Sequence, residues 1–246
     1  MAPVRITVAK IGSLKHPVDL RSIERRPSKI MQISHRASIP LLGDAEGGDW
    51  SYTDEQLRRV VQHRADAGDV TLGLINAPLE DNYYLRRLDE HTVVLSLFEM
   101  AEIVRRENYT VEAFVVRIAY SLTAMFAATG HVDWASQNER WTHDDIRGCL
   151  FDMCSNKSDI VFSMHKPVLC SACRTQAERH QLDPQFLPRL DGELRKLRKT
   201  TYYRIGDLVK AYPIAALVIT AGSGLALNIL ASIVFEILKR IWPSLG

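Results

Sequence analysis

The residues with the most distinctive chemistry in this chain are its four cysteines, which all lie in residues 149–173. Cys149 and Cys154 are separated by four residues, and Cys170 and Cys173 by two. Each closely spaced pair can chelate a metal, and zinc prefers four tetrahedral ligands supplied by two such pairs. The N-terminus lacks the long apolar segment of a signal peptide, so we expect a reducing compartment, where clustered cysteines favour metal over disulfides. We therefore predict a structural zinc ion bound by Cys149, Cys154, Cys170 and Cys173.

Two alternatives to this four-cysteine site stay open. Three of the cysteines could bind the metal together with His143 or His165, or the cysteines could be buried apolar residues that never meet. A site with four thiolates has no open position for water, so it would be structural rather than catalytic.

The cysteine spacing resembles that of the archaemetzincins, zinc peptidases of the metzincin group. In that family a catalytic HExxH helix is followed directly by Cx4C and later by CxxC, which residues 149–173 match. The resemblance implies a zincin-like domain whose catalytic motif would end just before Cys149, in the stretch NERWTHDDIRG. HExxH does not occur anywhere in the chain. Two histidines one helical turn apart are needed to face one metal ion, so we predict a degenerate zincin-like domain without catalytic residues.

The elements that must position these residues have the pattern of an α/β (α+β) domain. Short β-branched or alternating runs predict strands at residues 5–9, 70–75 and 92–98. A capping box predicts a helix over residues 54–67, and a second helix with a regular apolar face follows Thr110. Arg117 falls within that second helix and is expected at the edge of its apolar face. This order of elements predicts a mixed sheet with helices packed on it.

Basic side chains gather in two stretches that could bind an anion. One is the polar segment 15–36, and the other is PLEDNYYLRRLDE, where two tyrosines stand beside two arginines. Guanidinium groups pair with phosphates, and aromatic rings stack on bases. Both stretches could equally be solvated or packed loops. The candidate contacts for a nucleotide or a single-stranded nucleic-acid oligomer are Arg21, Arg25, Arg26, Lys29, Arg86 and Arg87.

The longest apolar segment, residues 214–238, lies near the C-terminus, and its single formal charge is Glu236. As a helix it would be roughly 37 Å long, enough to cross a bilayer core of about 30 Å. More basic residues precede this segment than follow it. The positive-inside rule then predicts a single-pass protein of the cell inner membrane with its N-terminal domain in the cytoplasm. The alternative is a buried helix or hairpin broken at the GSG of residues 222–224.

Polar and small residues recur every four positions along this segment. They fall on one slowly drifting helix face, and such groups in a membrane face a partner helix or water. We therefore expect a homo-oligomer in the lipid bilayer, held either by simple helix packing or around a narrow pore that favours cations. The predicted pore-lining residues are Thr220, Gly224, Asn228, Ser232 and Glu236.

The predicted organisation has three parts: a cytosolic sensing domain at 1–175 with its zinc module at 149–173, a basic helical connector at 176–211, and a transmembrane helix at 212–242. Together they predict a non-enzymatic membrane effector in which a ligand bound to the cytosolic domain gates an oligomeric channel. This architecture is similar to that of membrane effectors of bacterial antiphage defence systems such as the Hailong channel effector, which implies a nucleic-acid ligand and an antiviral role. The alternatives are a membrane-tethered zinc hydrolase or peptidase working with Glu139 and His143, and a plain membrane-anchored adaptor.

Overall fold

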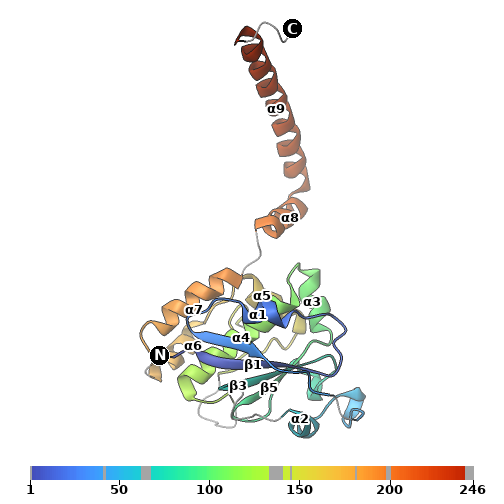
Figure 1. Cartoon of the computed structure of the whole chain (residues 1–246), viewed down its shortest axis with the longest axis vertical. Helices are drawn as coiled ribbons and strands as arrows, with labels where there is room; N and C mark the ends of the chain where they lie inside the picture. The colour runs from blue at the N-terminus through green and yellow to red at the C-terminus, as the bar shows by residue number, and fades with distance from the viewer. Residues whose placement is uncertain are drawn as a thin grey trace. The chain divides into compact units, whose positions relative to one another are not determined.

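A mixed sheet lies at the centre of the first part of the chain (Figure 1). The computed structural model describes residues 2–40, 43–61, 68–132, 141–144, 146–180, 182–197 and 201–241. Over these residues the sheet has five strands in the order β2-β1-β3-β5-β4. All neighbouring pairs are parallel except β4 with β5, which is antiparallel. The strands are β1 (Val4–Ile11), β2 (Met31–His35), β3 (Val70–Ile75), β4 (Leu85–Arg87) and β5 (Thr92–Ser96).

Helices cover both faces of the sheet, so its central strands are buried on both sides. Every residue of β3 and of β5 is buried. Val93 and Leu95 belong to the larger apolar cluster, whereas Val94 between them belongs to the smaller one, as the alternation of a strand requires. The helices of this part are α1 (Leu20–Glu24), α2 (Asp54–Val60), α3 (Met100–Arg106), α4 (Val111–Thr129), α5 (Ile160–His165), α6 (Ser171–Arg179) and α7 (Phe186–Leu194), with short 3-10 turns at Gly48–Trp50, Glu80–Asn82, Lys157–Asp159 and Arg195–Leu197.

Helix α4 is the main helix of the larger cluster. The Thr110 side chain accepts a hydrogen bond from the Ala113 amide at 3.1 Å, and Gly130 ends the helix at φ +79°. A left-handed C-cap of this kind favours glycine. Nearly the whole helix is buried from Val111 to Met125, including Arg117. The prediction that Arg117 lies at the edge of the apolar face is therefore wrong.

The α/β fold class is confirmed, with differences at individual elements. The predicted strands at 70–75 and 92–98 correspond to β3 and to β5, and that at 5–9 lies within β1. Strands β2 and β4 were not predicted. Helix α2 has the predicted capping box but ends at Val60, where Val61 turns to an extended conformation; residues 62–67 lie outside the described part.

The chain divides into two compact units, Met1–Arg198 and Lys199–Gly246. The first unit extends beyond the domain boundary expected at residue 175. Helices α6 and α7 bury Ala177, Phe186, Leu190 and Leu194 in the larger cluster. Much of the segment predicted as a basic connector therefore belongs to the folded first unit.

The second unit contains α8 (Thr201–Ala211) and α9 (Pro213–Ile241). Both α4 and α9 are long and apolar enough to cross a membrane. Helix α4 is mostly buried in the protein core, whereas no residue of the apolar window of α9 is buried. The apolar side chains of α9 are thus exposed, whereas those of α4 form part of the protein core.

Candidate metal centre and adjoining cavity

Three cysteines and one histidine converge beside the start of α6. His143 lies on an extended segment whose backbone pairs with Phe151 and Met153. Cys149 follows a turn at Gly148, which has φ +94° and whose carbonyl accepts the Val168 amide at 3.0 Å. Cys170 is the N-cap of α6, and Cys173 lies in its first turn. Two loops and a helix terminus therefore place the four side chains.

The donor atoms have the separations of a tetrahedral zinc site. His143 Nε2 lies 3.3 Å from Cys149 Sγ and 3.5 Å from Cys170 Sγ. Cys149 Sγ lies 3.9 Å from Cys173 Sγ, and all four donor atoms lie within 4.8 Å of one another. Two thiolates that are each about 2.3 Å from one tetrahedral ion are about 3.8 Å apart. His143, Cys149, Cys170 and Cys173 thus form a cluster capable of binding zinc.

The surroundings of the cluster favour a thiolate at Cys149. The hydrogen-bond contact between the Cys149 and Cys173 sulfurs lowers the pKa of Cys149 and, together with burial, raises the pKa of Cys173. The Cys170 amide also donates to Cys149 Sγ at 3.5 Å. Zinc binds deprotonated sulfur, so it would displace the proton that these two thiols share. With four protein donors, the chemistry of the ion here would be structural.

Cys154 does not belong to this cluster, which corrects the four-cysteine prediction. Its backbone has φ +52°, and its Sγ donates to the carbonyl of Asp152 at 3.5 Å. Burial raises the pKa of the Cys154 thiol to about 11, so it remains protonated. The ligand set is three cysteines with His143, one of the alternatives left open by the sequence; His165 instead contacts the hydroxyl of Tyr109 at 3.4 Å.

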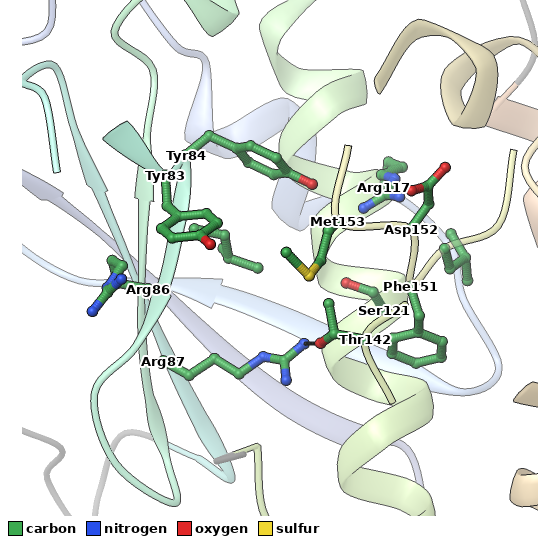
Figure 2. Close-up of a pocket in the computed structure, with 12 residues that line it drawn as sticks. Tyr83, Tyr84, Arg86, Arg87, Arg117, Ser121, Thr142, Phe151, Asp152 and Met153 are labelled. Carbon is green, nitrogen blue, oxygen red and sulfur yellow. Dashed lines mark hydrogen bonds between the residues drawn. The ribbon is translucent and has the colours of Figure 1, made fainter. Parts of the chain in front are cut away.

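A cavity of about 190 Å³ adjoins the segment that follows Cys149. It lies between β4, α4 and residues 150–153, and Figure 2 shows the side chains around it. Aromatic and apolar side chains alternate there with three arginines. The lining residues are Tyr83, Tyr84, Leu85, Arg86, Arg87, Arg117, Ser121, Thr142, Leu150, Phe151, Asp152 and Met153.

Arg117 connects this cavity to the metal cluster. Its Nη2 donates to the Cys149 carbonyl at 3.2 Å, and its Nε donates to Ser163 Oγ at 3.0 Å. The side chain is only 1% exposed. A buried guanidinium is costly unless its donors are satisfied, and these two contacts satisfy part of it.

The predicted ligand-binding residues do not come together in one place. Arg86 and Arg87 line the cavity; Arg86 makes a bidentate ion pair with Asp54 at 2.8 and 2.6 Å, and Arg87 donates to Thr142 Oγ1 at 3.2 Å. The remaining four lie in α1 or between α1 and β2, at the opposite edge of the sheet from β4. These four are Arg21, Arg25, Arg26 and Lys29.

Comparison with known proteins gives a structural likeness but no family. No family model matches the chain, and no curated protein matches it. Among solved structures, it is similar to the crystal structure of archaemetzincin from Methanopyrus kandleri, with 17% sequence identity, a TM-score of 0.49, and coverage of 73% of this chain and 96% of that chain. A likeness at this score and identity supports no inference about reaction or ligand.

Proposed function

We propose that the protein is a non-enzymatic membrane effector. In this proposal the α9 helices of several copies assemble into a pore in the bilayer, and the zinc-stabilised first unit controls the pore through a bound anionic ligand. The observation that carries the proposal is the long apolar window of α9, in which no residue is buried.

Helix α9 has the surface of a helix made for a bilayer. From Ile214 to Leu238, its leucine, isoleucine, valine and phenylalanine side chains are exposed. A helix that is apolar on most of its surface is typical of a protein core or of a membrane span, and no residue in the apolar window of α9 is buried. A Cβ added at Gly222 or at Gly224 would meet nothing within 4 Å. The small residues of α9 are therefore open to a neighbouring helix.

The predicted pore-lining side chains of α9 differ in whether they hydrogen-bond to the helix backbone. The hydroxyls of Thr220 and Ser232 donate to backbone carbonyls one turn earlier, at 2.8 and 3.0 Å, so they need no water or partner. Among the described residues, the side chains of Asn228 and Glu236 have no such partner. Polar groups like these at membrane depth mark contacts with a partner helix or an aqueous path. The case for a pore therefore rests on Asn228 and Glu236 more than on Thr220, Gly224 and Ser232.

The metal cluster supports a structural role for zinc. Four protein donors leave no position for a catalytic water, so a hydrolase would need a different site. Glu139, the partner of His143 in the hydrolase alternative, lies outside the described residues. The non-enzymatic reading is therefore the one that the geometry of the cluster supports.

The expected cellular location and orientation follow from the charges around α9. Basic residues before the apolar segment favour an inner-membrane protein with a cytoplasmic first unit. The combination of a ligand-binding cytosolic domain and a tail that oligomerises is also the architecture of bacterial antiphage membrane effectors. An antiviral role, with a nucleotide or nucleic-acid oligomer as the trigger, is part of the proposal.

Ion flux through liposomes that contain the full chain tests the pore. We expect the wild type to conduct cations, and Asn228→Leu and Glu236→Ala to reduce the flux several-fold. Leu230→Met is the matched control, because at about 100° per residue it lies on the opposite side of the helix and should leave the flux unchanged. The pore is contradicted if both test variants conduct as the wild type does, if the wild type does not conduct, or if the protein is a monomer in detergent. A monomer that stays in the membrane would favour an anchored adaptor.

A further inference from the structure

We infer that α8 is an amphipathic helix that lies in the surface of the bilayer, with an apolar stripe among the lipid chains and its charged side toward the headgroups and water. The partner that covers the stripe would be lipid rather than protein. The inference rests on the part of the proposed function that places α9 across the membrane, and it does not depend on a pore. It gives the chain a second membrane contact, beside the point where α9 enters the bilayer.

The first argument is the pattern of side chains along the second half of α8. Ile205 is followed by Leu208, Val209 and Tyr212, and this spacing of three, four and seven residues places all four on one side of a helix. All four are exposed, from Val209 at 46% to Tyr212 at 63%. These four residues are the apolar stripe of α8. Such a stripe beside a charged face is typical of a helix that binds in the plane of a membrane surface.

The second argument is the charge around the stripe. At about 100° per residue, Asp207 and Lys210 lie on the side of α8 away from the stripe. In residues 195–210 the only acidic residue is Asp207, whereas the basic residues are Arg195, Lys196, Arg198, Lys199, Arg204 and Lys210. Basic groups next to a membrane helix are attracted to the anionic headgroups of the cytoplasmic leaflet. The charge of this segment therefore complements an anionic lipid surface.

The third argument is the short connection between α8 and α9. Tyr212 is the single residue between the two helices, and its amide donates to the Leu208 carbonyl at 2.9 Å while its carbonyl accepts the Ala216 amide at 3.0 Å. Pro213 begins α9 and has no amide hydrogen, which interrupts the helical hydrogen bonds at this point. Figure 1 shows that α8 does not continue along the axis of α9. A helix that turns away at this point can lie along the surface that α9 crosses.

The length of the apolar window fixes the level of α8 in the bilayer. The window covers Pro213–Leu238, which is 26 residues. At about 1.5 Å per residue this is roughly 39 Å, more than the bilayer core of about 30 Å. When α9 spans the core, its first turn therefore reaches the headgroups, and α8 ends two residues before that turn. Tyrosine is enriched at this depth, where Tyr212 would lie.

Tryptophan placed on either side of α8 tests the inference. Leu208→Trp lies in the stripe, and Asp207→Trp, its matched control, lies on the opposite side at nearly the same distance from α9. The full-length variants are reconstituted in vesicles of phosphatidylcholine and phosphatidylglycerol whose acyl chains are brominated near the headgroup, and the wild-type signal is subtracted. We expect bromine to quench Leu208→Trp about twofold more strongly than Asp207→Trp, because the apolar side of such a helix lies about 5–10 Å into the boundary. Ile205→Trp, in the same stripe, should be quenched as Leu208→Trp is, and decides the test if Leu208→Trp does not reconstitute.

Two outcomes of the quenching overturn the inference. One is equal quenching of all three variants. The other is a tryptophan in the stripe that is shielded both from brominated lipid and from iodide in the water, which would show that protein covers the stripe.

Carbonate extraction of the wild type separates this failure from failure of the proposed function. If the wild type resists carbonate but the quenching test fails, the α9 span stands and the surface position of α8 is wrong. If carbonate extracts the wild type, the span is contradicted, and the inference about α8 falls with it.

Discussion

At the scale of residues, the metal cluster depends on which side chain is the fourth ligand beside three cysteines. Cys149, Cys170 and Cys173 come together because Cys149 pairs with Val168 just before α6 begins. His143 completes the set because its strand-like segment pairs with residues 151–153. That pairing, and the left-handed backbone at Cys154, direct Cys154 toward Tyr84 instead. None of these long-range pairings can be read from the spacing of the cysteines.

Single substitutions should separate the four cysteines by function. We expect about one zinc per wild-type chain, and loss of that zinc together with a lower Tm in Cys173→Ser, because a structural zinc site contributes directly to folding. Cys154→Ser is the matched control: its hydroxyl can keep the hydrogen bond to the Asp152 carbonyl, so zinc should stay bound. Metal analysis by mass spectrometry and thermal unfolding measure both effects. Zinc retained by His143→Ala but lost from Cys154→Ser would restore the four-cysteine site.

At the scale of elements, one acidic side chain holds α3 to the segment after β1. Lys15 Nζ donates to Glu102 Oε1 at 2.7 Å, and His16 Nε2 lies 3.1 Å from the same oxygen. The hydrogen bond from Lys15, and then that from His16, lower the pKa of Glu102 from 4.5 to about 2. A carboxyl whose pKa is lower in the folded state stabilises that state above its unfolded pKa and loses this contribution as the pH falls through the folded pKa.

Glu102→Gln should therefore lower the free energy of unfolding at neutral pH, by about 1 kcal/mol or less, because the side chain is 37% exposed and water screens the pair. The difference from the wild type should be full above pH 4.5 and shrink toward pH 2. Urea unfolding between pH 2 and 7 measures it, with Glu55→Gln, an exposed helical carboxylate, as the control. A difference that does not change with pH would show that the ion pair is not its cause.

The elements also show how far the sequence could predict this fold. Strands β3 and β5 are continuous apolar runs, and α4 has a cap and a regular apolar face, so local pattern was sufficient. Strands β2 and β4 lie at the sheet edges and contain polar and basic residues, so their pattern resembled a loop. Burial of Arg117 was missed because its partners, Ser163 and the Cys149 carbonyl, lie 46 and 32 residues further along the chain. The cavity beside it depends on the same distant segments.

At the scale of the whole molecule, the chain joins two units with opposite solvent requirements. Every described residue of the larger apolar cluster lies at or before Leu197, so this cluster belongs to the first unit. Helix α9, in contrast, exposes its large apolar side chains from Ile214 to Leu238. Exposed apolar area costs roughly 25 cal/mol per Å² in water, so α9 should determine where the protein resides.

Residues 1–198 expressed alone should consequently be soluble and keep both the zinc ion and the fold of the first unit. We expect about one zinc per chain and a Tm close to that of the full chain in detergent, since the described residues of the larger apolar cluster all lie in the first unit. The full chain should instead sediment with membranes and resist extraction by carbonate, which an integral helix survives and a surface-bound protein does not. Retention of the truncated chain in the membrane fraction would show that the first unit binds lipid itself. Aggregation of the truncated chain with loss of zinc would show that α8 or α9 covers part of the first unit. That result would contradict the proposal that the first unit folds as a regulator independently of the membrane helix.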